Sequence, residues 1–189
     1  MMSRSVLFFV VILLALPMSV LIAGTLKGIT MPDTIQVEDQ TLVLNGMALR
    51  KKFIFKVYVA GLYLPQKESD AEKILKGDTM RQCVMHWVRS VGINKINDGW
   101  YDGLEDNTPN YSPELKKQFD TMAGMMEAVK DGDLIVFTYV PGKGTEVKVK
   151  GEVKGVVEGK AFADALFACW IGPDPGPGEG FKDDLLGKD

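Results

Sequence analysis

The sequence NGMALRKKFIFKVYVAGLYL, residues 45–64, predicts the central strand of the fold. Its Asn-Gly pair is a turn signal, so we expect the strand to follow that pair. From residue 53 onward both faces of the strand are mostly apolar: Phe53, Phe55, Val57 and Val59 alternate with Ile54, Lys56, Tyr58, Ala60 and Leu62. Such a strand must be covered on both faces, which predicts helices on one face of a sheet and a second layer or an enclosed cavity on the other.

A glycine interrupts this strand. Gly61 indicates either a bulge or a close approach of another backbone segment, and it leaves the facing of Tyr63 open by one residue.

The remaining chain alternates between strand and helix patterns without an internal repeat. Alternating or apolar runs predict strands at residues 34–37, 41–44, 80–91, 134–140, 145–150 and 153–157, of which the last three form antiparallel hairpins. Capping signals and helical spacing predict helices from the capping sequence at residues 69–72 to Gly77, at residues 94–104, 112–131 and 162–171. The fold class is therefore α+β.

Residues 1–23 have the layout of a secretory signal peptide. Arg4 precedes an unbroken apolar run at residues 6–16, and Pro17 and a short stretch ending in Ala23-Gly24 follow. We expect cleavage after Ala23 and an exported, periplasmic protein. The alternative is an uncleaved membrane anchor, because residues 6–26 reach the roughly 20 residues that cross a bilayer. That anchor is the one membrane contact that the sequence predicts.

The composition is that of one globular domain. The 189 residues are 46% hydrophobic and 25% charged, with a formal net charge of −3. Lysines are scattered and form adjacent pairs only at residues 51–52 and 116–117, so the chain offers no electrostatic footprint for nucleic acid.

Few residues have the pattern of a catalytic or metal site. Cys83 and Cys169 could form a disulfide in an exported protein, but their apolar neighbours favour two buried thiols. His86, the only histidine, lies among apolar strand residues and is interpreted as structural. We therefore predict no metal site and no cofactor.

Arg50 stands at the head of an otherwise apolar strand. A guanidinium group can hold a carboxylate by two parallel hydrogen bonds, which makes Arg50 a candidate for ligand binding. The alternative is a solvated basic rim that Arg50 shares with Lys51 and Lys52.

Several short motifs together resemble the chalcone isomerase-like family in its exported bacterial form, over residues 29–187. They are NGMALR at residues 45–50, KVYVAGLYL at 56–64, PGKGT at 141–145, FADALF at 162–167, WIG at 170–172 and LLG at 185–187. The resemblance implies an open-faced β-sandwich in which a large, mainly antiparallel sheet and a layer of helices enclose an apolar cleft. It also implies that Arg50 points into this cleft, with Ala48 where a second glycine is usual.

The family contains enzymes that close a chalcone into a flavanone and relatives that bind fatty acids, and this sequence departs from the enzymes. Lys95 matches an active-site lysine, but Gly92 stands where the isomerase has a tyrosine and Gly99 where it has an asparagine. Ring closure needs donors on the developing enolate oxygen. The two glycines therefore favour binding over catalysis.

Three hypotheses follow. The first is a protein that binds a fatty acid or a similar amphipathic carboxylate, with Arg50 on the head group and Tyr58 or Tyr63 adding a hydroxyl. The second is an isomerase, an intramolecular lyase that acts on a chalcone-like enone through Arg50 and Lys95. The third is a structural or partner-binding envelope protein. The natural ligand and the oligomeric state do not follow from the sequence.

Overall fold

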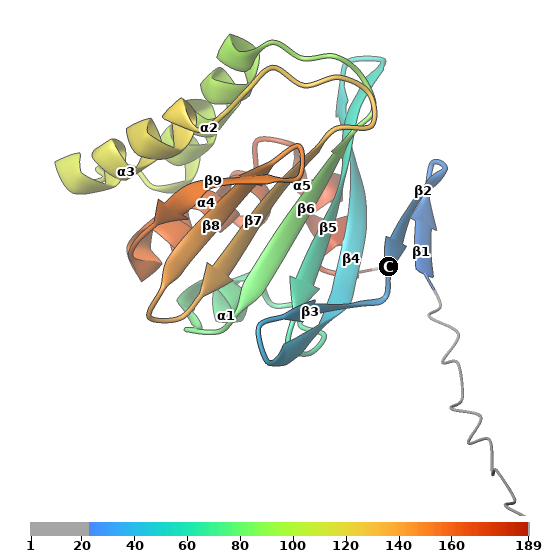
Figure 1. Ribbon diagram of the computed structural model, residues 1–189, viewed down its shortest axis with the longest axis horizontal. Helices are drawn as coiled ribbons and strands as arrows, with labels where there is room; N and C mark the ends of the chain where they lie inside the picture. Colours follow the sequence, from blue (N-terminus) through green and yellow to red (C-terminus); the bar gives the residue numbers. More distant parts are fainter. Residues whose placement is uncertain (1–22, 189) are drawn as a thin grey trace, which may run out of the picture.

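The fold is built on one antiparallel sheet, described in a computed structural model that covers residues 23–188. Its seven strands are β3 (Thr34–Val37), β4 (Gln40–Lys52), β5 (Phe55–Leu64), β6 (Arg81–Trp87), β7 (Leu134–Val140), β8 (Gly144–Val149) and β9 (Glu152–Val157). They lie in the sheet in sequence order, as Figure 1 shows, so every strand pairs with its neighbours in the chain. The predicted antiparallel hairpins of residues 134–157 are confirmed.

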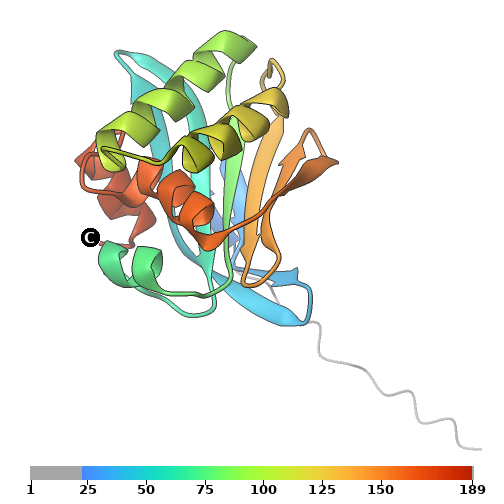
Figure 2. The same cartoon turned by 90° about the vertical axis from the view of Figure 1, so that its left-hand side faces the viewer.

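Helices cover one face of the sheet and a small hairpin covers part of the other (Figure 2). The helices are α1 (Ala71–Lys76), α2 (Ile93–Asn107), α3 (Pro113–Gly124), α4 (Lys160–Ile171) and α5 (Glu179–Leu185). The main core lies beneath them. A second, smaller core lies on the opposite face, where β1 (Ala23–Leu26) and β2 (Ile29–Pro32) form the covering hairpin.

The stretch that we interpreted as one strand is a hairpin. β4 runs through Asn45 and Gly46, and the chain turns at Phe53 and Ile54 instead. Asn45 is buried and its amide donates to the carbonyl oxygens of Glu68 and Leu185, at 3.0 and 2.9 Å. A Cβ at Gly46 would come within 2.6 Å of the Leu185 carbonyl oxygen. The Asn-Gly pair therefore serves packing against the end of α5, and the predicted turn at this pair is wrong.

Gly61 marks neither a bulge nor the approach of another backbone segment, but a place where a side chain packs against the strand. The pairing of β5 with β6 is continuous from Tyr58 opposite Trp87 to Tyr63 opposite Gln82. The Met31 sulfur of β2 occupies the space that a side chain at Gly61 would need. Because the alternation is unbroken, Tyr63 shares the face of Gly61 and packs beneath the β1–β2 hairpin.

Two helices start with polar caps near the predicted positions, but the cap of α1 is Asp70 and not Ser69, the first residue of the predicted capping box. The Asp70 carboxylate accepts hydrogen bonds from the backbone of Glu72 and Lys73 at the start of α1, and Ser112 caps α3 through the Leu115 N–H. The α3 helix ends at Gly124, however, and not at the predicted residue 131. Val129 continues the apolar stripe outside the helix, in a bridge with Val91.

Cys83 and Cys169 are buried free thiols, as the sequence favoured. No helix within residues 23–188 is long and apolar enough to cross a membrane. Residues 1–22 of the predicted signal peptide or anchor lie outside the part of the chain that the structure describes. Ala23 belongs to β1.

Candidate functional site

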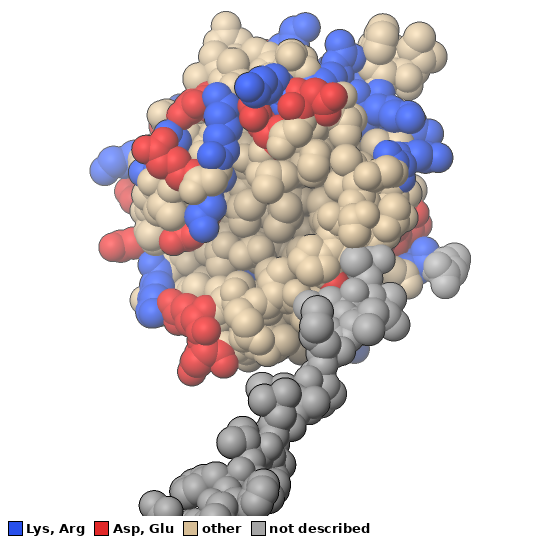
Figure 3. Space-filling model, turned by 45° about the vertical axis from the view of Figure 1, so that its right-hand side comes forward, with Lys and Arg blue, Asp and Glu red and all other residues tan. Residues whose placement is uncertain are grey.

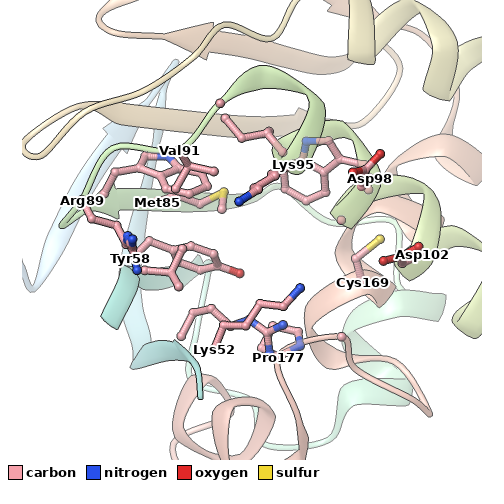
Figure 4. A pocket seen from close by; sticks show the side chains of 18 of the residues that line it. Lys52, Tyr58, Met85, Arg89, Val91, Lys95, Asp98, Asp102, Cys169 and Pro177 are labelled. Carbon is pink, nitrogen blue, oxygen red and sulfur yellow. The ribbon is translucent and has the colours of Figure 1, made fainter. Parts of the chain in front are cut away.

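A cavity of about 1010 Å³ lies between α2 and the end of the sheet where β4 turns into β5 (Figure 4). This size lies at the upper end of the usual range for ligand sites. Its walls come from β4, β5, β6, the loop before α2, α2 itself, the end of α4 and the loop at Gly176 and Pro177. The cavity is on the helix-covered face of the sheet. The strand pattern left a second layer or a cavity open for the face opposite the helices; the β1–β2 hairpin forms a partial second layer there, and the alternative of a cavity on that face is wrong.

Aromatic side chains form the apolar part of the wall. Trp87 belongs to β6, Trp100 to α2 and Trp170 to α4, and Met85 of β6 also lines the cavity. The rings of Trp100 and Trp170 are 5.4 Å apart and perpendicular, a favourable edge-to-face geometry. The indole N–H groups of Trp87 and Trp100 are buried and have no hydrogen-bond partner among residues 23–188. They are donors that an oxygen atom in the cavity could satisfy.

Tyr58 brings a neutral hydroxyl into the same space. Its ring packs against Trp87 at 5.1 Å, and its hydroxyl oxygen accepts a hydrogen bond from the Trp170 indole N–H at 3.3 Å. Burial raises the pKa of this phenol far above its ordinary value of 10.0, although Trp170 and Arg50 act in the opposite direction. Tyr58 therefore keeps its proton at neutral pH and can donate it to a ligand oxygen.

Four cations line the end of the cavity near the β4–β5 turn: Arg50, Lys52, Arg89 and Lys95. Arg50 lies directly opposite Tyr58 in the β4–β5 pairing, so their side chains share the helix-covered face. Figure 4 shows the Lys52 and Lys95 ammonium groups and the Tyr58 hydroxyl directed into one space. None of the four cations forms an ion pair with a residue that the structure describes. Their charge is free to meet a bound anion.

The α2 helix adds to this polarity. Lys95 stands in its first turn, where the helix dipole already carries positive partial charge and disfavours a cation. Asp98, Asp102 and Asp106 line the cavity from successive turns of the same helix. Asp106 is about 16 Å further along the axis than Lys95 at 1.5 Å per residue. The cavity is thus cationic at one end and acidic toward the other.

Two glycines of α2 and its N-terminus widen the cavity. Gly92 and Gly99 both line it, and a Cβ at either would meet nothing within 4 Å. These are the positions where the isomerase pattern expects a tyrosine and an asparagine. The glycines therefore leave open space where a Cβ of such a side chain would stand.

Cys169 is not a nucleophile in this setting. It lines the cavity, but burial raises the pKa of its thiol to about 12, which leaves it protonated at neutral pH.

The structure brings together Arg50, Tyr58 and Lys95, and it does not bring Tyr63 to them. Tyr63 lies on the opposite face of the sheet and donates its hydroxyl proton to the Pro32 carbonyl oxygen at 2.9 Å. The sequence analysis missed Lys52, Arg89 and the three tryptophans. Lys52 has the same strand parity as Arg50, so the alternation could have identified it, but the sequence pattern was interpreted as a solvated basic rim of Lys51 and Lys52.

Comparisons with known proteins agree with this architecture. A family model described as chalcone isomerase-like matches residues 23–187. The structure is similar to the crystal structure of a fatty-acid binding protein from Arabidopsis thaliana, with a TM-score of 0.70 and 15% sequence identity, over 87% of this chain and 95% of that one. No curated protein matches the sequence significantly. At this identity the structural likeness bears on the fold, and it confirms the α+β class and the sheet with its helical layer.

The family follows from the match, which covers nearly all of the described residues and confirms the resemblance seen in the motifs at residues 45–64 and 162–187. This chain belongs to the chalcone isomerase-like family.

Proposed function

We propose that the protein binds a fatty acid or a similar amphipathic carboxylate in this cavity, with Arg50 at the polar end. The observation that supports it most is one space that combines an aromatic wall with four cations lacking ion-pair partners among residues 23–188. The similar Arabidopsis protein is named as a fatty-acid binding protein, which adds support. The apolar run at residues 6–16 supports the further proposal that the protein is exported.

In this proposal the tail supplies affinity and the head group supplies orientation. Each CH₂ of a long acyl chain that is buried adds about 0.8 kcal/mol to the free energy of binding, on the order of 10 kcal/mol gross for the whole chain. A charged hydrogen bond adds roughly 1.5–3 kcal/mol. The carboxylate accepts from Arg50 and from the neutral Tyr58 hydroxyl, while the chain lies along Trp87, Trp100 and Met85.

Calorimetric titration of delipidated protein with palmitate tests the proposal. We expect wild type to bind palmitate, and Arg50→Ala to bind it about tenfold to a hundredfold more weakly. Lys51→Ala is the matched control, because Lys51 is the exposed neighbour of Arg50 and does not line the cavity. It should bind like wild type.

Hexadecanol separates the head group from the tail, because it has the same chain and no carboxylate. Wild type and Arg50→Ala should bind it equally. If wild-type protein binds no palmitate and releases no lipid to mass spectrometry after solvent extraction, the proposal fails.

Isomerase activity is the second candidate, because β4 and α2 place Arg50 and Lys95 on one cavity together with a protonated Tyr58. Conversion of a chalcone, followed by absorbance, tests it. A rate above background that disappears in both Arg50→Ala and Lys95→Ala would support an enzyme. Equal background rates in all three proteins would exclude it. A structural envelope role loses its main argument, since the space behind Arg50 is a cavity and not a filled core.

A further inference from the structure

The turn between β4 and β5 carries the most exposed large apolar side chains of residues 23–188. Phe53 is 89% exposed, Ile54 86% and Phe55 53%, whereas no other large apolar residue exceeds 51%. The turn stands at the end of the two longest strands, at the top of Figure 1. Three adjacent, solvent-exposed apolar side chains at one projecting turn are unusual on a protein surface. They indicate that the turn contacts another apolar surface.

Folding does not explain these residues. A two-residue turn between antiparallel strands favours asparagine and glycine, because it calls for positive φ angles. Phe53 occupies this position with φ of 55°, a region that bulky side chains rarely adopt. Phe53 and Ile54 are therefore unfavourable residues for this turn. Binding to another molecule explains their presence better than the stability of the fold does.

The apolar turn is surrounded by positive charge. Lys51 and Lys52 precede it and Lys56 follows it, while Arg89 lies over the Phe55 ring at 4.7 Å. None of these four cations pairs with an acidic residue in the described part of the chain. The sequence from residue 40 to residue 67 contains no aspartate or glutamate, although the whole chain has a net charge of −3. Figure 3 shows the resulting blue cluster beside projecting uncharged atoms at its upper right.

We propose that this hairpin tip, residues 51–56, docks the protein on an anionic lipid bilayer. Phe53 and Ile54 enter the interface between head groups and acyl chains, and the lysines meet lipid phosphates, each adding attraction to an anionic surface. A lipid bilayer is favoured over a protein partner because the tip has two matching parts. Its apolar side chains complement the acyl chains, and the cations around them complement the anionic head groups. This contact is separate from the N-terminal anchor considered above, and it needs no bound ligand.

Docking through the tip also orients the cavity. Lys52, Phe53 and Phe55 belong both to the hairpin tip and to the cavity wall. A bilayer at the tip therefore lies against the cationic end of the cavity, where an amphipathic molecule could pass from membrane to protein without crossing water.

A local fluorescent reporter tests the docking on the full chain. Ile54→Cys is labelled with an environment-sensitive dye. The reaction favours position 54 because Cys83 is buried, and because burial raises the pKa of the Cys169 thiol, which lines the cavity, to about 12 and keeps it protonated. Vesicles are made of equal parts phosphatidylcholine and phosphatidylglycerol, or of phosphatidylcholine alone. We expect dye fluorescence to rise with the mixed vesicles and much less with the neutral ones. The same dye at Val156→Cys, an exposed position on β9, should not respond.

Charge and apolar variants divide the contact into its parts. Lys51→Gln with Lys56→Gln should weaken vesicle binding by the labelled protein about fivefold per lysine. The matched control, Lys117→Gln with Lys130→Gln, removes two exposed lysines elsewhere and should have no effect. In co-sedimentation, Phe53→Ser with Ile54→Ser should lose binding that Val153→Ser with Val156→Ser retains.

Three outcomes would overturn the proposal: no response at position 54, an equal response at positions 54 and 156, or a response that rises with protein concentration in the absence of vesicles. The last would indicate self-association through the tip. Residues 1–22 are identical in every variant, so binding through that segment alone would be equal in the tip variants and in their matched controls. Palmitate binding is measured without vesicles, and its failure would leave the docking result standing.

Discussion

Arg50 and Arg81 lie on the same face of the sheet in opposite surroundings. Arg81 is fully buried, pairs with Asp164, donates to the Ile74 carbonyl oxygen at 2.7 Å and stacks against two aromatic rings. Arg50 is half-buried beside a cavity and has no ion-pair partner within residues 23–188. A buried cation whose charge is compensated inside the protein is structural, whereas the uncompensated one is available to a ligand. The sequence could not show this contrast, because Asp164 is 83 residues away from Arg81.

The buried tyrosines predict a loss of stability at alkaline pH. Burial raises the pKa of Tyr63 and of Tyr139 to about 12 from 10.0, and it raises that of Tyr58 further. Unfolded phenols lose their protons near pH 10.0 while the folded ones keep theirs, so the unfolded state binds fewer protons and the free energy of unfolding falls as pH rises. We expect urea midpoints to decrease steadily between about pH 10 and pH 12.

Tyr63→Phe isolates one part of this effect. The variant loses the hydrogen bond to Pro32 at every pH, which lowers stability by a constant amount, and it also loses one titrating group. Its urea midpoint should therefore start lower than that of wild type and fall less steeply. Parallel curves for the two proteins would contradict the assigned role of Tyr63.

At the scale of elements, α2 contains two glycines with opposite environments. Gly99 faces the open cavity, whereas a Cβ at Gly103 would lie 2.8 Å from the Cys169 sulfur on α4. Gly99→Ala should raise the free energy of unfolding by about 0.5–1 kcal/mol, because alanine restricts the unfolded chain and favours the helix. Gly103→Ala should lower it, because α2 and α4 must move apart. Urea unfolding of the two variants measures both signs, and equal effects would mean that helix propensity alone decides.

Element types were predictable where the signal is local. The Ser112 cap, the glycine after α1 and the period of two in β7, β8 and β9 depend on neighbours in the chain, and the structure confirms them. The signals at Asn45 and Gly46 are local in appearance only. Asn45 forms hydrogen bonds with Glu68 and with the end of α5, and Gly46 leaves room for the backbone at that end. Both partners are distant in sequence. Asn-Gly is the same residue pair whether it forms a turn or packs against a distant element, so the sequence alone could not distinguish the two roles.

At the scale of the molecule, the cavity is assembled from three separated stretches: residues 50–58, 85–106 and 169–177. Arg50 could be named in advance from its place at the head of an apolar strand, which the family resemblance strengthened, and Lys95 from that resemblance alone. Trp87, Trp100 and Trp170 fit ordinary core patterns, and only the tertiary arrangement makes them a cavity wall. The face of the sheet that carries the cavity was also not predictable from β5, since both of its faces are apolar and both are buried.

A series of saturated fatty acids tests whether the whole cavity acts as one binding site. If the tail lies along the aromatic wall, binding should strengthen by about 0.8 kcal/mol for each added CH₂ until the volume of about 1010 Å³ is filled. Arg50→Ala should shift this line to weaker binding without changing its slope, because the head group contributes the same amount at every chain length. Calorimetry on chains of increasing length gives both slopes. A slope near zero would place the tail outside the cavity, and a slope that differs between the two proteins would mean that Arg50 shapes the apolar wall instead of holding the carboxylate.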